Sequence, residues 1–274
     1  MALSPEHVEH YEREGWIAPL DLLSSADAEE LRSELEAAEA AHPEHFHAEH
    51  RNNAHLVLPF LTELGRHPMI VEAVQALVGA DVTLAASVLF IKEPHSGSFV
   101  SWHQDAKYMA LAPANFVTAW VALSPSTAES GCVAVVPGTH RAGARHHDDT
   151  YGEDNILTRG QNVPGIDPDT AVNLELQPGQ MSLHHPWLVH GSRPNTTDGR
   201  RIGVAFQSYL GADVTPEHGT YHVLHVAGAP VRPEFVECSP PDGICTPAGV
   251  AARNAANDAY AEVLYQGASK RRAL

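Results

Sequence analysis

A histidine and an aspartate separated by one residue, His103 and Asp105, form the first group in this sequence that could do chemistry. We expect them at the end of a β-strand, where alternate side chains point to the same face, so that the imidazole and the carboxylate converge. Together they would offer two ligands to a divalent metal ion. Taken alone, the spacing favours a simpler interpretation, which is a hydrogen-bonded pair on the protein surface.

Two more candidates, His190 and Arg201, lie well after this pair. His190 comes 85 residues beyond Asp105, at the end of an apolar strand, and Arg201 follows eleven residues later at the start of another, residues 202–210. A turn with proline, asparagine and glycine separates them, so we expect adjacent strands that bring Arg201 beside His190. A buried arginine must find an anion, and a dicarboxylate that chelates the metal would supply one.

Two histidines and one carboxylate on one face, with open coordination positions, are typical of non-haem Fe(II) oxygenases. His103, Asp105 and His190 match that set. A structural zinc site would need a closed set of four ligands, usually with thiolates. A metal-dependent isomerase or hydrolase on a cupin-like jelly roll would use the same three ligands, but it would leave Arg201 without a task. A ligand-binding protein that has lost catalysis is a further alternative, which the intact set disfavours.

Around these residues the sequence resembles the phytanoyl-CoA dioxygenase family of Fe(II)- and 2-oxoglutarate-dependent oxygenases. The resemblance covers residues 85–210 well, and six motifs in the family's order carry it. They are WHQD at 102–105, TAW at 118–120, SGCVAVVPGTH at 130–140, HGS at 190–192, PN at 194–195 and the arginine at 201. The core of this family is a double-stranded β-helix, also called a jelly roll, and the resemblance implies that fold.

The resemblance also implies a role for each matching side chain. Iron would be bound by His103, Asp105 and His190, the distal carboxylate of 2-oxoglutarate by Arg201, and the 2-oxoglutarate pocket would be lined by Ser192 and Trp120. Plain core packing is the alternative for Trp120. Asp105 is present where related halogenases carry a small residue, so the resemblance favours hydroxylation over halogenation.

The reaction that the resemblance implies uses O2 and 2-oxoglutarate, releases succinate and CO2, and oxidises an unactivated C–H bond. Hydroxylation is the simplest outcome, while desaturation, cyclisation and epoxidation stay open. The lysines are Lys92, Lys107 and Lys270, and they form no basic cluster suited to a CoA phosphate group. We therefore expect a free small metabolite, such as a natural-product or amino-acid-derived intermediate, whose identity the sequence does not determine.

The expected secondary structure agrees with this fold. The first 80 residues are predicted to be helical, with helix starts at Ser4, at Ser24 and near Pro68. Short segments rich in valine, phenylalanine and alanine follow, separated by glycine, proline or asparagine, which predicts an antiparallel sandwich or barrel. These segments are 82–91, 116–123, 132–136, 171–176, 180–184 and 202–210. A last helix is expected over about 246–265.

We expect a single domain over residues 1–274, mainly β with helices. Its parts would be a helical N-terminal part over about 1–80, a jelly-roll core over about 81–211 and a C-terminal loop and helix extension over about 212–274. The role of that extension is not evident from the sequence. His222 and His225, which lie within it, could form a lid over the pocket.

The remaining polar residues near the motifs are assigned more simply. Gln104 is expected to point away from the metal, while Lys107, Tyr108 and Met109 would continue along the mouth of the pocket. His140 is expected to be a hydrogen-bonded turn residue. Most of the 19 histidines are expected in solvated loops, including those at 42, 45, 47, 50, 146 and 147.

Composition excludes several classes of protein. The formal net charge is −17, which disfavours a nucleic-acid binder or a protein adsorbed to an anionic membrane. No apolar run is long enough to span a membrane and no signal peptide is visible, so we expect a cytoplasmic protein. The cysteines Cys132, Cys238 and Cys245 are expected to be free thiols, although the last two could pair. The oligomeric state cannot be deduced from the sequence.

Overall fold

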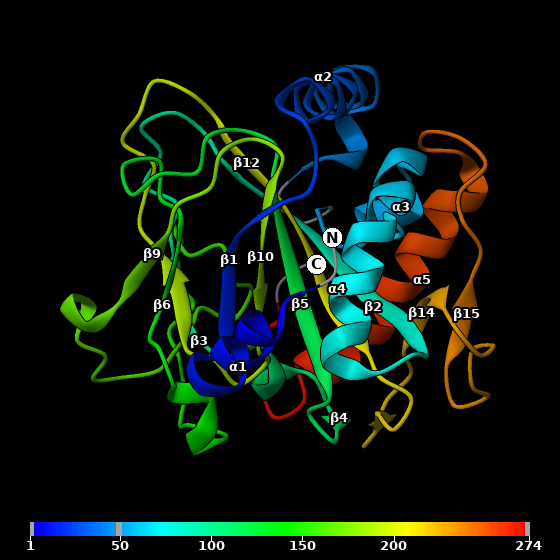
Figure 1. Ribbon diagram of the computed structural model, residues 1–274. Coiled ribbons are helices and arrows are strands. Elements are labelled where there is room, and N and C mark those ends of the chain that lie inside the picture. The colour runs from blue at the N-terminus through cyan, green and yellow to red at the C-terminus, as the bar shows by residue number, and fades with distance from the viewer. Residues whose placement is uncertain (1–2, 48–50, 272–274) are drawn as a thin grey trace.

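The computed structural model describes residues 3–47 and 51–271, and its core is a jelly roll of two β-sheets (Figure 1). The larger sheet holds, in spatial order, β1 (Trp16–Asp21), β10 (Gln180–His184), β5 (Phe116–Ala122), β12 (Arg201–Leu210), β2 (Val82–Lys92), β14 (His222–Ala227) and β15 (Val236–Cys238). The smaller sheet holds, in spatial order, β3 (Val100–His103), β11 (His190–Ser192), β6 (Val133–Val135) and β9 (Val172–Leu174). The mainly β jelly-roll fold expected from the sequence is confirmed.

Helices precede and follow the strands of this core in the sequence. They are α1 (Pro5–Glu14), α2 (Ser25–Ala41), α3 (Pro59–Gly65), α4 (Pro68–Val78) and α5 (Pro247–Leu264). Ser4 and Ser24 cap α1 and α2, because each hydroxyl accepts a hydrogen bond from the backbone N–H three residues later. Four of these helices begin where the sequence predicts, whereas α3 was not expected. Among the described helices, none is long and apolar enough to cross a bilayer.

Shorter elements connect these parts. The 3-10 helices are η1 (Pro43–His45), η3 (Ala54–Leu56), η4 (Asp105–Tyr108), η5 (Thr139–Ala142) and η6 (Pro168–Thr170). Two further sheets have two strands each, β4 (Leu111–Ala112) with β13 (Thr215–Pro216), and β7 (Asp148–Asp149) with β8 (Gln161–Asn162).

His42, His45 and His47 lie at the end of α2 and in η1 or just after it, whereas His50 lies outside the described residues. All three cysteines are free and buried.

Strand β5 shows how the larger sheet separates two apolar layers. Every residue of β5 is buried, so both of its faces are covered. Val117, Ala119 and Val121 pack with the helices in one core cluster, while Trp120 and Ala122 belong to a second cluster shared with the smaller sheet. This alternation is what a strand buried on both faces requires. In Figure 1 the smaller sheet and helices α3 and α4 accordingly lie on opposite sides of β5.

The C-terminal extension differs from its expected form. It was expected to hold loops and a helix, but it also contributes β14 and β15 to the edge of the larger sheet, with β14 antiparallel to β2 and parallel to β15. Strands β1 and β3 were also not expected. Each of these strands is short or lies beside a glycine, proline or charged residue, so its local pattern is weak. Tertiary pairing with a neighbouring strand stabilises it.

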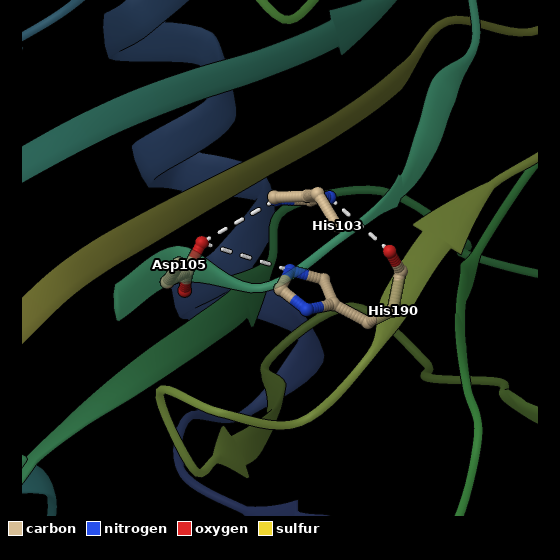
Figure 2. A group of neighbouring side chains, drawn as sticks. All are labelled: His103, Asp105 and His190. Atoms are coloured by element: carbon tan, nitrogen blue, oxygen red, sulfur yellow. Dashed lines mark hydrogen bonds and ion pairs between the residues drawn. The ribbon is translucent and has the colours of Figure 1, made fainter. Parts of the chain in front are cut away.

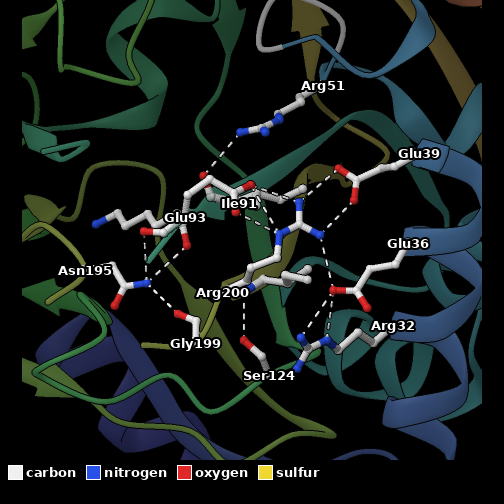
Figure 3. Close-up of polar contacts among 12 residues, drawn as sticks. Arg32, Glu36, Glu39, Arg51, Ile91, Glu93, Ser124, Asn195, Gly199 and Arg200 are labelled. Carbon is white, nitrogen blue, oxygen red and sulfur yellow. Dashed lines mark hydrogen bonds and ion pairs between the residues drawn. The ribbon is translucent and has the colours of Figure 1, made fainter. Parts of the chain in front are cut away.

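Arg200, which directly precedes β12, connects α2 to the start of that strand (Figure 3). Its guanidinium pairs with Glu36 and Glu39 of α2 and with Glu93 just after β2, at distances of 2.9–3.2 Å. Because strand side chains alternate, Arg201 then points to the opposite face, into the space between the two sheets. The network outside thus fixes the start of the strand that carries the buried arginine.

Candidate functional site

His103, Asp105 and His190 converge between the two sheets (Figure 2). One ligand atom of each lies within 4.8 Å of the others. Asp105 Oδ1 is 3.4 Å from Nε2 of His103 and 3.8 Å from Nε2 of His190. Both residues of the first pair are buried, so the simpler interpretation of a surface pair is wrong. Two imidazoles and one carboxylate facing a common point match the ligand set of a mononuclear iron site.

Backbone carbonyl groups orient both imidazoles. Nδ1 of His103 lies 3.0 Å from the carbonyl of Ser101 and 3.1 Å from that of His190, and Nδ1 of His190 lies 3.0 Å from that of Leu188. A carbonyl can only accept, so each Nδ1 carries the proton and donates it. Each Nε2 is left with its lone pair directed at the cluster, as a metal ligand requires.

Protonation states in the cluster also suit metal binding. Burial alone would raise the pKa of Asp105, but the neighbouring imidazoles of His190 and His103 and a hydrogen bond from Thr118 lower it below its usual value. Thr118 Oγ1 donates to Asp105 Oδ2 at 3.0 Å. Burial, followed by repulsion from His103, lowers the pKa of His190 to about 4. At neutral pH the carboxylate is therefore charged and His190 is neutral.

The backbone around these residues differs from expectation in two details. Strand β3 ends at His103, and Asp105 begins the 3-10 helix η4, with Gln104 extended between them. The two side chains still share a face because that linking residue keeps a strand conformation. His190 begins β11 and does not end the preceding apolar strand, which is β10 and stops at His184.

Arg201 reaches the site from the other sheet. We expected its strand to lie beside that of His190, but β12 pairs with β2 and β5, while β11 pairs with β3 and β6. The expectation of adjacent strands is therefore wrong. The two residues meet across the sandwich, since both line one narrow cavity of about 30 Å³. Trp120 and Ser192 line the same cavity.

Arg201 is buried with most of its hydrogen-bonding capacity unused. It is 1% exposed, Nη1 donates to the Phe90 carbonyl at 3.2 Å, and Nε has no partner. The guanidinium carbon lies 5.4 Å from the centre of the Trp120 ring. Burial lowers the pKa of Arg201 to about 10, which still leaves it charged at neutral pH. A buried cation with an unpaired N–H is what an anion-binding pocket presents.

A glycine allows this arrangement. Gly203 lies on the same inner face of β12, and a Cβ atom there would stand 1.9 Å from a ring carbon of Trp120. No larger residue fits while the indole keeps its place beside Arg201. Trp120 therefore packs in the core and also lines the narrow cavity.

A larger cavity of about 550 Å³ adjoins the narrow one. The two share Phe90, His103, Asp105 and Gln207, so they meet at the cluster. Tyr108 and Met109 line the larger cavity as expected, whereas Lys107 does not. Tyr260 and Leu264 of α5 form part of its wall, which no local signal in the sequence indicated.

Sequence reasoning also missed Gln207, His184 and Lys92. Gln207 Nε2 lies 3.4 Å from Asp105 Oδ1, and the His184 ring lies 5.7 Å from that of His190. Gln207 and Arg201 occupy the same face of β12, which the alternation of a strand could have revealed. His184 is the last residue of the predicted strand segment 180–184, and it carries no partner in the sequence that would mark it.

The other residues singled out in the sequence lie elsewhere. Gln104 points away from the cluster as expected, and its amide donates to the carbonyls of Gly143 and Trp187. His222 and His225 lie in β14 and line neither cavity, so the expected lid is wrong. His140 lies in the turn η5, with Nε2 3.0 Å from the Glu12 carbonyl.

The distribution of these motifs matches a known family. A model of the family described as phytanoyl-CoA dioxygenase (PhyH) matches residues 11–203. The chain belongs to this family. Membership of the phytanoyl-CoA dioxygenase family agrees with the resemblance carried by the sequence motifs, and the match includes every residue of the cluster and Arg201.

Individual relatives are more distant. A protein of Caenorhabditis elegans named "Probable phytanoyl-CoA dioxygenase" is 32% identical over 155 residues, which cover 54% of this chain and 50% of the relative. The rat peroxisomal enzyme is matched over 42% of its length. The chain thus spans about half the length of these curated relatives.

Solved structures match over more of the chain. The structure of the non-heme monooxygenase ThoJ is 29% identical, with a TM-score of 0.83, and the match covers 94% of this chain and 97% of ThoJ. The alpha-ketoglutarate-dependent carbocyclase SnoK from nogalamycin biosynthesis is 25% identical, with a TM-score of 0.62 over 78% of this chain and 86% of SnoK. The C-terminal extension therefore lies largely within the match to ThoJ.

Proposed function

We propose that this protein is an Fe(II)- and 2-oxoglutarate-dependent dioxygenase that oxidises a C–H bond of a small metabolite. His103, Asp105 and His190 would hold the iron, and Arg201 would bind the distal carboxylate of 2-oxoglutarate, with Ser192 and Trp120 beside it. The observation that carries the proposal is the unpaired Nε of buried Arg201, in a cavity that it shares with the three ligands. A metal isomerase or hydrolase would have no use for that cation.

The residues present fit both the iron and 2-oxoglutarate. Three ligands leave open positions on a six-coordinate metal, which a chelating 2-oxo acid and O2 need. When bound, the iron would supply the redox chemistry that couples oxidative decarboxylation of 2-oxoglutarate, which releases succinate and CO2, to attack on a C–H bond. The narrow cavity alone is smaller than a five-carbon dicarboxylate, so part of the cosubstrate would extend to where the two cavities meet.

The protein's own contribution is orientation. Backbone carbonyls hold each histidine in one tautomer, and Thr118 holds the free oxygen of Asp105. These contacts fix the directions of the three ligands before the metal binds. Burial of His103 and Asp105 limits the access of water to the reacting centre, which protects against unproductive oxidation.

We propose the larger cavity as the substrate site. Its volume of about 550 Å³ lies in the range typical of small-molecule pockets, ~300–1,000 Å³. Its wall combines apolar residues, such as Leu157 and Leu264, with polar ones, such as Asn155 and Gln207. Such a wall supports a free metabolite with both apolar and polar parts. Because α5 completes it, we propose that the extension and the core work as one domain.

Hydroxylation is the outcome we propose for the substrate. Asp105 fills the coordination position that a halide would need, so chlorination is disfavoured. The relatives named above include a monooxygenase and a carbocyclase, and cyclisation is therefore the main alternative outcome of the same chemistry.

The experiment that tests the function needs no substrate. Purified protein is loaded with Fe(II) without oxygen, 2-oxoglutarate is added, and the visible charge-transfer band of the chelate is recorded. We expect the band in the wild type and its absence in Asp105→Ala. A folded, iron-loaded wild type without the band would overturn the proposal. Admission of O2 with candidate metabolites, followed by succinate quantification, then ranks substrates.

A further inference from the structure

Lys92 is a buried lysine beside the proposed 2-oxoglutarate pocket. It ends β2 directly opposite Arg201 of β12, so the two side chains lie on the same inner face of the larger sheet. The side chain of Lys92 is fully buried, with an exposed fraction of 0%. Lysine is almost never buried to this degree without a partner for its charge, so its position requires an explanation.

The neighbours of Lys92 provide no negative charge. Within the described part of the chain, the titratable groups that act on its amine are Arg201, which repels it, and the thiol of Cys132. Burial, followed by the charge of Glu175, raises the pKa of that thiol to about 11, so the thiol is neutral at physiological pH. Two basic side chains therefore lie together in the interior with no carboxylate between them.

The amine of Lys92 contacts three oxygen atoms. Nζ lies 2.6 Å from the hydroxyl of Ser192 and 3.3 Å from the carbonyl of Gly131, and it also contacts the carbonyl of Arg193. Gly131 permits this approach, because a Cβ atom there would stand 2.9 Å from Nζ. The number of acceptors equals the number of N–H bonds of an ammonium group.

This geometry determines the direction of the Ser192 hydroxyl. An ammonium group can only donate, so in the charged state of Lys92 the Ser192 oxygen must accept. The hydroxyl proton is then free to point away from the lysine. Ser192 lines the narrow cavity together with Arg201, so an anion in that cavity is the acceptor available to it.

We propose that Lys92 is a positioning residue for 2-oxoglutarate, which adds a second positive charge beside Arg201 and turns the Ser192 hydroxyl toward the distal carboxylate. This inference rests on the proposed function. It explains why a lysine is tolerated without an acidic partner: the cosubstrate completes the charge balance. Lys92 acts through Ser192 and through its field, and it does not line the cavity.

The test compares the binding of two 2-oxo acids to the Lys92→Met variant, which keeps most of the length of the side chain and removes its charge. Calorimetric binding to the Fe(II)-loaded protein without oxygen is measured for 2-oxoglutarate and for 2-oxopentanoate, which lacks the distal carboxylate. We expect the variant to bind 2-oxoglutarate about tenfold more weakly, as for loss of a charged hydrogen bond. Its affinity for 2-oxopentanoate should stay within about twofold of the wild type.

A matched control separates this role from general destabilisation. Arg253→Met also removes a buried cation, because Arg253 is 1% exposed and donates to the His45 carbonyl, but Arg253 lines neither cavity. It should leave both affinities unchanged. In a Ser192→Ala background, the effect of Lys92→Met should shrink, since the hydroxyl that it orients is gone. If Lys92→Met weakened the binding of 2-oxoglutarate and of 2-oxopentanoate equally, the inference would be overturned.

A second measurement uses the wild type, so that it does not depend on a folded variant. Burial, followed by repulsion from Arg201, lowers the pKa of Lys92 to about 6. Binding of a dicarboxylate beside Lys92 must raise that pKa. Near pH 8, the protein should therefore take up more protons when it binds 2-oxoglutarate than when it binds 2-oxopentanoate, by at most about one proton. Calorimetry in two buffers of different ionisation enthalpy measures this difference.

The outcomes are distinct. No extra proton uptake, with tight binding of 2-oxoglutarate, would overturn the role of Lys92 and leave the proposed function intact. Failure of the wild type to bind 2-oxoglutarate at all would overturn both.

Discussion

His103 and His190 are directly paired across strands β3 and β11, although 87 positions separate them in the sequence. Their ring centres lie 4.1 Å apart, and Nδ1 of His103 donates to the backbone carbonyl of His190. The pairing of the strands thus sets the distance between two proposed iron ligands. This hydrogen bond directs Nε2 of His103 at Asp105, and the bond from Nδ1 of His190 to the Leu188 carbonyl does the same for His190.

Asp105→Ala should abolish tight iron binding. The substitution removes the one anionic ligand and leaves only the two imidazoles, so Fe(II) affinity should fall by at least about 100-fold. Titration of Fe(II) without oxygen measures the affinity, and succinate formation measures activity. Asp154→Ala is the matched control for iron affinity, because it removes a carboxylate that is not part of the cluster. Full succinate formation in Asp105→Ala would contradict the ligand assignment.

Arg201 and Arg200 should separate cosubstrate binding from stability. Arg201→Met removes the buried cation, so the KM for 2-oxoglutarate should rise by about 100-fold or more while the fold is retained. Arg200→Met breaks the pairs with Glu36, Glu39 and Glu93 on the opposite face (Figure 3). It should lower the melting temperature and speed proteolysis of α2, with an unchanged KM. The reverse pattern would refute the orientation of the two side chains.

Gly203→Ala should damage the pocket through Trp120. The added Cβ would stand 1.9 Å from the indole, so Trp120 or the strand must move, at a cost of about 1–3 kcal/mol in the free energy of unfolding. Urea unfolding measures the cost, and binding of 2-oxoglutarate should weaken with it. Gly199→Ala serves as the control, since a Cβ there meets no atom within 4 Å. Equal stability of the two variants would argue against close packing of Gly203 on Trp120.

Stability of the metal-free protein should fall in mild acid. Burial, followed by repulsion from Arg66, lowers the pKa of His55 to about 3, against 6.5 for a free histidine. Between about pH 6.5 and 3 the unfolded chain therefore binds a proton that the native state excludes. The free energy of unfolding should drop as pH falls through this window, by up to about 1.4 kcal/mol per pH unit for each such histidine.

The His55→Asn variant tests this origin. It should have a smaller slope of unfolding free energy against pH between about pH 6.5 and 4 than the wild type, measured by urea unfolding in a chelating buffer. Above about pH 7 the contribution of His55 to the slope should vanish, because the imidazole is neutral in both states. An unchanged acid slope in the variant would show that other groups account for it.

Much of the site could be predicted because its signals are local. The spacing of His103 and Asp105, the HGS motif at His190 and the arginine eleven residues later are short patterns. Helix caps such as Ser4 and Ser24 are local as well, since a cap needs only its own side chain and the next turn. These features were predicted correctly for that reason.

What the sequence alone could not supply depends on contacts between distant segments. Arg201 was expected on a strand next to His190, yet it reaches the cavity from the opposite sheet, because strand order is set by the packing of whole layers. The same holds for the wall that Tyr260 and Leu264 of α5 provide, and for β14 and β15.

The sequence by itself determined the proposed ligand set, the arginine beside it and the family, because chemistry at a metal needs particular residue types at nearly constant spacing. Only the tertiary structure decided that Lys92 stands beside Arg201, that Ser192 contacts Lys92 and lines the narrow cavity, and that α5 forms part of the wall of the larger one. The physical reason is that burial and charge balance belong to the assembled sandwich, where residues far apart in the chain share one interior.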